Sequence, residues 1–181
     1  MSRKHCLFVL VSILIVTFGC VLYDFNGQSF DISDREVRLI VTDSMDGNVS
    51  EYQIHSFPKN TLVMIQKVDA DRISEMIHIG DVVSFRQGGI YNHHRVVSIH
   101  MDDGYIETKG DNSYFSESVQ LGDVCGKVVG TNHIIGEILA FAHNHIWLVL
   151  AVMFVIVASD YVYVTLKNEK QKEKEQYEYN A

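Results

Sequence analysis

The chain has 181 residues, a formal net charge of −8 and 47% hydrophobic residues. This length allows one domain with appendages. The acidic balance argues against nucleic acid as a partner, because phosphate binding depends on clustered lysine and arginine side chains. The sequence has no Cys/His spacing typical of a metal site, no glycine-rich phosphate loop and no internal repeat, so we expect no metal and no cofactor.

An uncharged apolar run covers residues 6–22, about 17 residues, which is the lower limit for a helix that crosses a bilayer. Basic residues precede the run and aspartates follow it, so the positive-inside rule predicts a cytoplasmic N-terminus. The alternatives are a cleaved signal peptide and a lipoprotein-type Cys20, but residues 18–22 make a poor cleavage site. The sequence therefore predicts a transmembrane anchor over residues 1–22.

A second apolar stretch, over residues 145–166, is also long enough to span a bilayer as a helix. Trp147 lies near its start, as interfacial anchors do. Asp160 interrupts the stretch near its end, where a carboxylate can reach the lipid headgroups or stay protonated. Lysines alternate with glutamates over residues 167–181, which predicts a charged cytoplasmic tail. We therefore expect two membrane spans with both chain ends in the cytoplasm.

Between the anchors, residues 23–144 hold nine Lys and Arg against eighteen Asp and Glu and are expected outside the cytoplasm. Roughly 120 residues can bury a core without disulfides. Short runs of β-branched and aromatic residues alternate here with glycine turns, which favours strands. The expected strands are 38–42, 61–67, 81–86, 95–100, 105–109 and 127–130, with one helical turn at 71–77. The predicted fold is mainly β, a small antiparallel sheet or partly closed barrel flanked by two transmembrane helices.

Polar residues at the ends of these strands supply the candidate chemistry. Ser44 follows the first expected strand, His93 and His94 precede the fourth, and Asp111 and Glu117 follow the fifth. Each residue alone is typical of a loop. A serine hydroxyl needs an adjacent base to act as a nucleophile, and a histidine base works better when a carboxylate fixes its tautomer. Together, the three kinds of side chain favour a serine hydrolase.

Six short segments of the chain resemble the successive boxes of type I signal peptidase. They are residues 42–45, 57–65, 79–85, 94–97, 108–112 and 126–130. The subtype they resemble is the endoplasmic-reticulum-like branch, found also in archaea and Gram-positive bacteria, in which histidine replaces the lysine base. The segments run in the family's order and cover essentially all of the predicted outer domain.

The resemblance implies a role for each of these side chains. Ser44 is the implied nucleophile and His94 the implied general base. The Thr42 hydroxyl would bind the oxyanion together with the Ser44 backbone N–H. Two carboxylates remain candidates for the third catalytic residue, because Asp111 matches the Gly-Asp box while Glu117 occupies the position of the family's later aspartate.

The resemblance also implies the function of a membrane-bound serine endopeptidase that removes signal peptides from exported preproteins. Met45 and Val63 would line a shallow apolar groove that accepts small side chains by strand addition. The lipid bilayer is a further expected partner, whereas the breadth of substrates and any partner subunit stay open.

Two features of the sequence depart from the family pattern. Asp46 and Gly47 follow Met45 where the family more often has an acidic residue and proline, and residues 48–56 form an apparent insertion. They motivate an alternative function, a catalytically reduced or inactive module for binding or assembly. A variant mechanism with Lys67 as the base is a weaker alternative, because Lys67 lies inside an expected strand.

Overall fold

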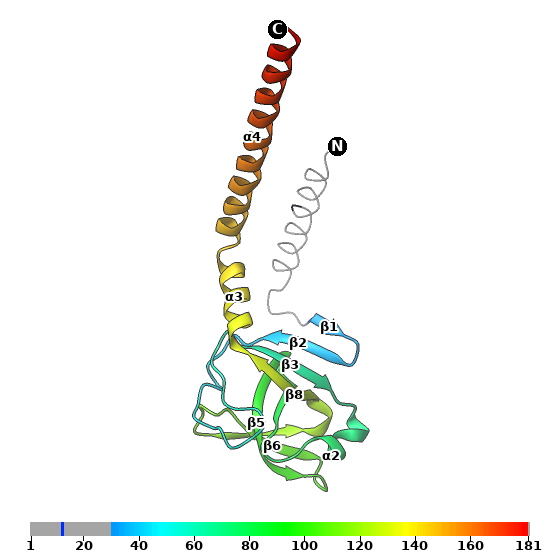
Figure 1. Cartoon of the computed structure of the whole chain (residues 1–181). Helices are drawn as coiled ribbons and strands as arrows, with labels where there is room; N and C mark the ends of the chain where they lie inside the picture. The colour runs from blue at the N-terminus through cyan, green and yellow to red at the C-terminus, as the bar shows by residue number, and fades with distance from the viewer. Residues whose placement is uncertain (1–11, 13–29, 181) are drawn as a thin grey trace. The chain divides into compact units, whose positions relative to one another are not determined.

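A computed structural model describes residues 12 and 30–180 of the chain (Figure 1). The elements, in chain order, are β1 (Phe30–Ile32), β2 (Arg35–Leu39), β3 (Leu62–Lys67), η1 (Ala70–Arg72), α2 (Ile73–Met76), β4 (Val82–Gln87), β5 (Ile90–His100), β6 (Tyr105–Lys109), β7 (Ser116–Gln120), η2 (Leu121–Asp123), β8 (Val124–Asn132), α3 (His133–Asn144) and α4 (Ile146–Tyr179). The predicted anchor over residues 1–22 lies outside the described residues, apart from residue 12.

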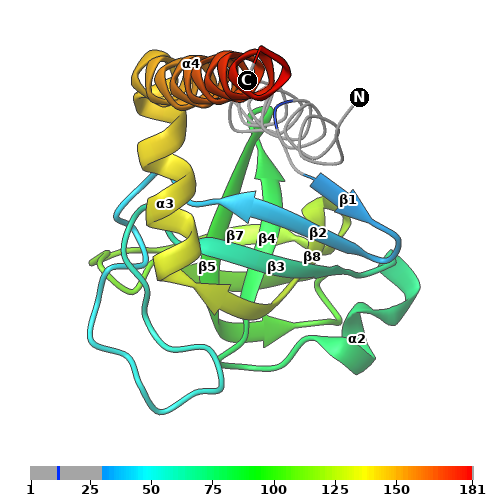
Figure 2. The same cartoon turned by 45° about the horizontal axis from the view of Figure 1, so that its top comes forward.

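The strands form one antiparallel sheet in the order β1-β2-β3-β8-β4-β5-β6-β7. Long β8 pairs with β3 over one part of its length and with β4 over another, so it joins the two halves of the sheet. The register shifts at Met64/Ile65, Ser84/Phe85 and Val96/Ser98, and such irregularities increase local twist. The sheet curls accordingly (Figure 2), which confirms a mainly β, partly closed antiparallel fold.

Two clusters of buried apolar side chains fill the curled sheet. One cluster lies beneath the segment that follows β2 and comprises Ile40, Met45, Phe57, Val63, Ile65, Val82 and Val128. The other lies where β4, β5, β6 and β7 meet and comprises Val68, Ile73, Ile77, Val83, Phe85, Val96, Ile106, Val119 and Val124. Successive residues of β4 alternate between the two clusters, since neighbouring side chains of a strand point to opposite faces.

The sequence prediction and the structure differ at several elements. Strand β1 was not expected, and β5 begins at Ile90 where the predicted strand began at residue 95. The strand expected at 38–42 runs instead from Arg35 to Leu39, so the segment before Ser44 is an extended connection. Strand β7 was not expected, because its sequence Ser-Glu-Ser-Val-Gln contains a single apolar residue. Helix α3 was not expected either, and it covers residues that the prediction had left without secondary structure.

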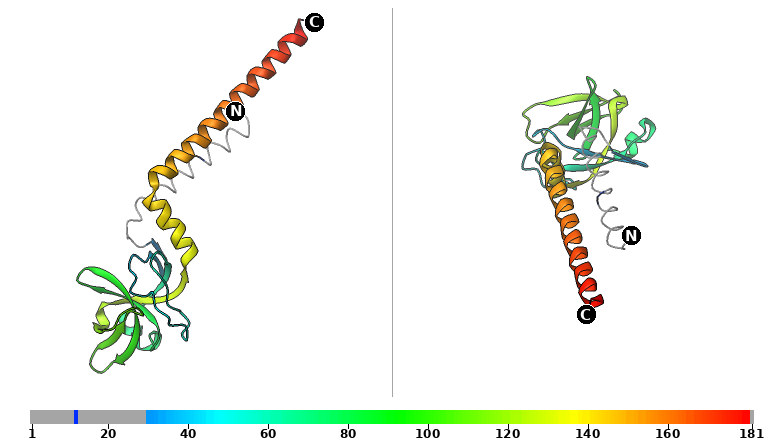
Figure 3. Two further views of the ribbon diagram at one scale, coloured as in Figure 1. Left: turned by 90° about the vertical axis from the view of Figure 1, so that its left-hand side faces the viewer. Right: turned by 90° about the horizontal axis from the view of Figure 1, so that it is seen from above.

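Helix α4 runs without interruption from Ile146 to Tyr179 (Figure 3). Its apolar part is long and hydrophobic enough to cross a membrane, judged by length and composition. It is the one helix among the described residues with this property. The expected C-terminal apolar helix is therefore present.

Helix α3 packs against the start of β3 through Gly136. A Cβ atom at this position would lie 2.0 Å from the Asn60 carbonyl oxygen and 2.6 Å from the Leu62 nitrogen. The Asn60 amide also donates to Glu137 at 3.2 Å, and the Thr61 hydroxyl contacts His133 at 3.3 Å. Glycine is thus the residue that lets the helix approach this backbone so closely.

We expect Gly136→Ala to lower the free energy of unfolding by about 1–3 kcal/mol, because overpacking against backbone outweighs the better helix propensity of alanine. Urea unfolding of the full chain in detergent micelles, followed by tryptophan fluorescence and circular dichroism, measures the change. Ile138→Ala on the exposed side of the same helix is the control, with an expected effect below about 1 kcal/mol. A Gly136→Ala chain as stable as the parent would contradict this packing.

Candidate active site

Ser44 lies in a tight turn just after β2. The Asp46 amide donates to the Asp43 carbonyl at 3.1 Å, and the Gly47 amide donates to the Met45 carbonyl at 3.1 Å. Met45 is completely buried, and the Phe57 amide donates to its carbonyl at 2.9 Å. The buried methionine therefore anchors the turn to the core while the neighbouring serine stays partly exposed.

The glycine turn after β6 packs directly on the serine turn. The Asn112 amide donates to the Ser44 carbonyl at 2.9 Å, and its side chain donates to the Asp43 carbonyl at 3.2 Å. A Cβ atom at Gly110 would lie 2.7 Å from the Ser44 carbonyl oxygen and 3.3 Å from His94 Nε2. One small position thus touches both the serine turn and the histidine ring, so these two predicted site residues lie together.

Glu117 holds the other side of the His94 ring. His94 lies on β5 and Glu117 on β7, and a Glu117 Oε1 contacts His94 Nδ1. Thr108 on the intervening β6 lies opposite Glu117, and its hydroxyl donates to the same Oε1 at 3.5 Å. The Phe85 ring packs at 5.8 Å from the imidazole. His94 therefore presents Nδ1 to a carboxylate and Nε2 toward the serine turn.

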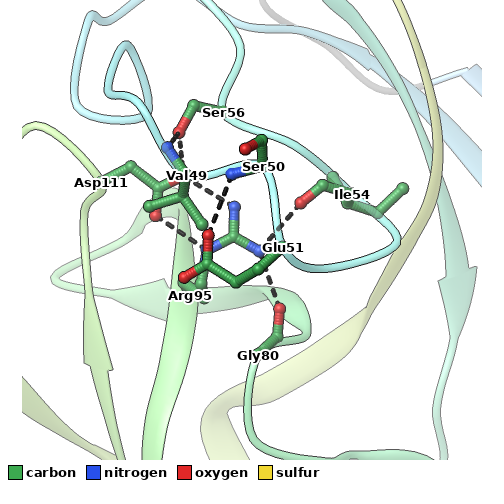
Figure 4. A network of polar contacts seen from close by, with 8 residues as sticks. All are labelled: Val49, Ser50, Glu51, Ile54, Ser56, Gly80, Arg95 and Asp111. Atoms are coloured by element: carbon green, nitrogen blue, oxygen red, sulfur yellow. Dashed lines mark hydrogen bonds and ion pairs between the residues drawn. The ribbon is translucent and has the colours of Figure 1, made fainter.

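Asp111 has a different partner, because it forms a buried fork with Arg95 (Figure 4). Arg95 Nε and Nη2 donate to its two carboxylate oxygens at 2.9 and 2.7 Å, and the Ser56 hydroxyl donates to it at 2.7 Å. Arg95 Nη1 also donates to the carbonyls of Ile54 and Gly80 at 2.9 and 2.7 Å. The network ties the insertion at residues 48–56 to the sheet.

The position of Gly80 in this network requires glycine. Its φ is +93°, and a Cβ atom there would overlap the Tyr52 ring at 2.2 Å. The same ring lies 5.2 Å from the Arg95 guanidinium carbon. The Tyr52 ring therefore packs the insertion over Arg95, the residue that follows His94 in the sequence.

Beside Ser44 lies an open groove of about 330 Å³. One wall is the chain from β2 into the serine turn and the other is the start of β5. The lining residues are Arg38, Leu39, Ile40, Val41, Thr42, Ser44, Met45, Gly89, Ile90, Tyr91, Asn92 and His93. Of the two residues predicted to line it, Met45 does so, whereas Val63 is completely buried in the adjacent core.

Thr42 lies at the mouth of the groove with Ser44. The two hydroxyl oxygens are 3.3 Å apart. Thr42 is exposed, so its hydroxyl is accessible to a molecule in the groove. The structure thus places the Thr42 hydroxyl, the expected oxyanion donor, beside the Ser44 hydroxyl.

Lys67 lies far from this cluster. It ends β3, whereas Leu62 at the start of β3 is the residue paired with Leu39 just before the serine turn. Five residues of strand separate the two positions, or roughly 17 Å. The geometry therefore brings His94, and not Lys67, to Ser44.

Arg38 and His93, which line the groove, and Glu36, the partner of Arg38, form a second polar group, of which only His93 was expected from the sequence. Arg38 and Glu36 are both buried and form an ion pair. Burial, the charge of Arg38 and that of His94 together lower the pKa of His93 to about 3. The sequence did hold a signal for the pairing of Glu36 with Arg38, because side chains two residues apart on a strand share a face.

No protein-family model matches the chain, and a comparison with curated proteins finds no match. Among residues 12 and 30–180, no group of three or more His, Cys, Asp or Glu side chains is placed to hold a metal ion. What the site does must therefore be argued from its own side chains.

The depressed pKa of His93 predicts a loss of stability in acid. Because its pKa is about 3 in the folded chain and near 6.5 when unfolded, the unfolded chain binds more protons between these values. The free energy of unfolding should therefore fall as pH falls from 6.5 to 3, by up to about 4 kcal/mol from this group. Urea unfolding of the full chain at several pH values measures the change.

His93→Gln should flatten that part of the pH dependence, because glutamine does not titrate. His55→Gln, at an exposed histidine, is the matched control and should leave the profile of the parent chain unchanged. Equal acid sensitivity in the parent and His93→Gln chains would contradict a neutral, buried His93.

Proposed function

We propose that this chain is a membrane-bound serine endopeptidase that removes signal peptides from exported preproteins, as a type I signal peptidase does. The observation that carries the proposal is the placement of the His94 ring, between the Glu117 carboxylate at Nδ1 and the Ser44 turn near Nε2. The proposed nucleophile, base and orienting acid come from three separate segments of the chain, and a base oriented in this way by a carboxylate can activate a serine hydroxyl.

In the proposed reaction, Ser44 Oγ attacks the carbonyl carbon of the peptide bond while His94 Nε2 takes its proton. His94 then gives that proton to the leaving amine, and an acyl-enzyme remains on the serine. A water molecule, deprotonated by His94, then attacks the acyl carbon; as the bond from that carbon to Ser44 Oγ breaks, His94 returns the proton to Oγ and the second product leaves as a carboxylic acid. Glu117 accepts the Nδ1–H hydrogen bond throughout, so it holds the tautomer and stabilises the imidazolium.

The two carboxylates left open by the sequence receive separate roles in this proposal. Glu117 is the orienting acid because it contacts the imidazole. Asp111 is a positioning residue, since both of its carboxylate oxygens accept hydrogen bonds from Arg95. Glu117 reaches the ring from β7, across the intervening β6, and the extra methylene of glutamate relative to aspartate extends this reach.

The groove beside Ser44 suits an extended peptide. Within residues 30–180, β1 pairs with β2 only as far as Val37, and β6 pairs with β5 only from Arg95 onward. Among residues 30–180, the start of β5 therefore has a strand partner on the β4 side only, and a substrate added as a strand would pair with its other edge. Ile40 and Met45 belong to the apolar core directly beneath the groove.

The membrane supplies the location. We propose two spans, the apolar run at residues 6–22 and the apolar part of α4, with both chain ends in the cytoplasm. The β domain would then face the far side of the bilayer, where the end of a translocated signal peptide emerges. The lipid bilayer is a partner in this arrangement, and nucleic acid is not.

A second candidate is a non-catalytic module for binding or assembly on the same scaffold. One observation favours it: in the described part of the chain, the Ser44 hydroxyl contacts Thr42 and not His94. Catalytic hydrogen bonds are often long before substrate binds, so this contact is compatible with both candidates. The two differ in what they predict for Ser44→Ala.

The peptidase proposal predicts that Ser44→Ala and His94→Ala each lower preprotein cleavage by at least about 10⁴-fold, because each removes the activated nucleophile. Glu117→Gln should lower kcat by about 10²–10⁴-fold with little change in stability. Asp111→Asn should instead cost about 3 kcal/mol of stability, since it leaves Arg95 buried without its partner charge. Cleavage by full-length variants in liposomes, with unfolding measured in parallel, tests all four.

Val97→Ala, at an exposed position on the same strand as His94, is the control and should retain full activity. Undiminished cleavage by Ser44→Ala would remove Ser44 as the nucleophile. No cleavage by the parent chain would leave the binding module as the function. A larger loss of kcat for Asp111→Asn than for Glu117→Gln, at equal folded fraction, would reverse the roles of the two carboxylates.

Thr42→Val should lower kcat by about 10²-fold or more with little change in KM, because one oxyanion donor contributes about 3 kcal/mol to the barrier and acts only in the transition state. Thr42→Ser keeps the hydroxyl and should retain most of the activity. Steady-state kinetics on a peptide substrate separates kcat from KM. Equal activity of the valine and serine variants would exclude Thr42 from the oxyanion site.

A further inference from the structure

We propose, on the basis of the peptidase function above, that Arg38 and Tyr91 form an end wall of the substrate groove. This wall would select peptides with a small side chain about four residues before the cleaved bond. Tyr91 is then a specificity-determining residue, distinct from the groups that perform the chemistry.

The two side chains reach across the groove from opposite walls. Arg38 comes from β2 and Tyr91 from the start of β5, and both line the groove. The Arg38 guanidinium carbon lies 3.5 Å from the centre of the Tyr91 ring, which is a stacking contact. Because Ser44 lies six positions further along the wall that begins at Arg38, the stack closes the groove at the end remote from the nucleophile.

The inner part of this end wall is held in place by its surroundings. Arg38 is 7% exposed and paired with the equally buried Glu36 on the same strand. The Arg86 guanidinium lies 5.8 Å from the other partner, the Tyr91 ring. Tyr91 itself is 37% exposed, so its ring forms the outer layer of the wall and can be removed with little disturbance of the core.

The length of the groove follows from the geometry of the extended wall. Residues 38–42 span roughly 13 Å at a strand rise of about 3.3 Å per residue, so about four residues of an extended peptide fit beside them. In the proposed reaction, His94 gives its proton to the leaving amine, so the leaving side of the substrate lies by His94. His94 does not line the groove, whereas Ser44, which forms the acyl-enzyme, does. The groove therefore takes the acyl side of the substrate, the residues before the cleaved bond.

A side chain at the fourth of these positions would meet the stacked guanidinium and phenol rings. The contact leaves no space between the two walls, so a large side chain is excluded while alanine or glycine is accepted. Beyond this point the substrate chain must leave the groove. Positions five and six before the cleaved bond are thus outside the wall's influence.

The test uses internally quenched peptides with alanine at six positions before the cleaved bond, and a parallel set with tryptophan placed at each position in turn. The full-length chain in liposomes should cleave the all-alanine peptide and cleave the position-four tryptophan peptide at least about tenfold less efficiently. Tyr91→Ala should remove that difference, so that this variant cleaves the all-alanine and position-four tryptophan peptides with kcat/KM values within about twofold of each other. Tyr91→Phe keeps the ring and should behave as the parent chain.

Tyr105→Ala is the matched control, because it removes a tyrosine at the far end of the β5–β6 hairpin and should leave the tryptophan profile unchanged. If the parent chain cleaves the peptides and Tyr91→Ala has the same tryptophan profile as the parent, the end wall is overturned. The peptidase function would then remain intact. Failure of the parent chain to cleave any peptide or a preprotein, with no difference from Ser44→Ala, would overturn both. A changed profile in Tyr91→Ala alone supports the proposal.

Discussion

The buried ion pair of Arg95 and Asp111 is the interaction on which the candidate site depends. Its arginine follows His94 on β5, and its aspartate belongs to the glycine turn that binds the Ser44 carbonyl through Asn112. The same guanidinium holds the 48–56 insertion through Ile54. A charge pair this deeply buried is costly to break, because either partner left alone would be a desolvated charge. The serine turn and the imidazole are consequently held in one fixed relation.

The separate roles proposed for the two carboxylates, Asp111 and Glu117, follow from where each is placed. Asp111 is surrounded by donors from Arg95 and Ser56, so its lone pairs are already occupied. Glu117 lies on the edge strand β7 and is partly exposed, and its contacts are the imidazole and the Thr108 hydroxyl. A carboxylate that orients a base must have an oxygen to spare for the ring. Glu117 on the edge strand has such an oxygen, and Asp111 in the buried turn does not.

The groove combines an apolar floor with a polar end. Ile40 and Met45 belong to the core beneath the serine turn, so the groove lies directly over that apolar cluster. At the other end, the ion pair of Glu36 and Arg38 lies behind the surface, beside a histidine whose pKa is depressed by burial. Such a pair adds little net stability, because the desolvation of both groups offsets their attraction. Its consequence here is a defined position for the guanidinium at the groove end.

The sequence by itself determined the mainly β character of residues 23–144, most of the strands, the apolar C-terminal helix, and the residues Ser44, Thr42 and His94 as candidates. Those features depend on local periodicity, turn residues and motif order, which a single chain displays directly. Only the tertiary structure assigned Glu117 to the imidazole and Asp111 to Arg95, because that choice depends on the register of β5, β6 and β7. The weakly apolar β7 gave no local signal of that register. The contact between Arg38 and Tyr91 could not be predicted from the sequence either, since the curl of the sheet brings together two residues that are 53 positions apart.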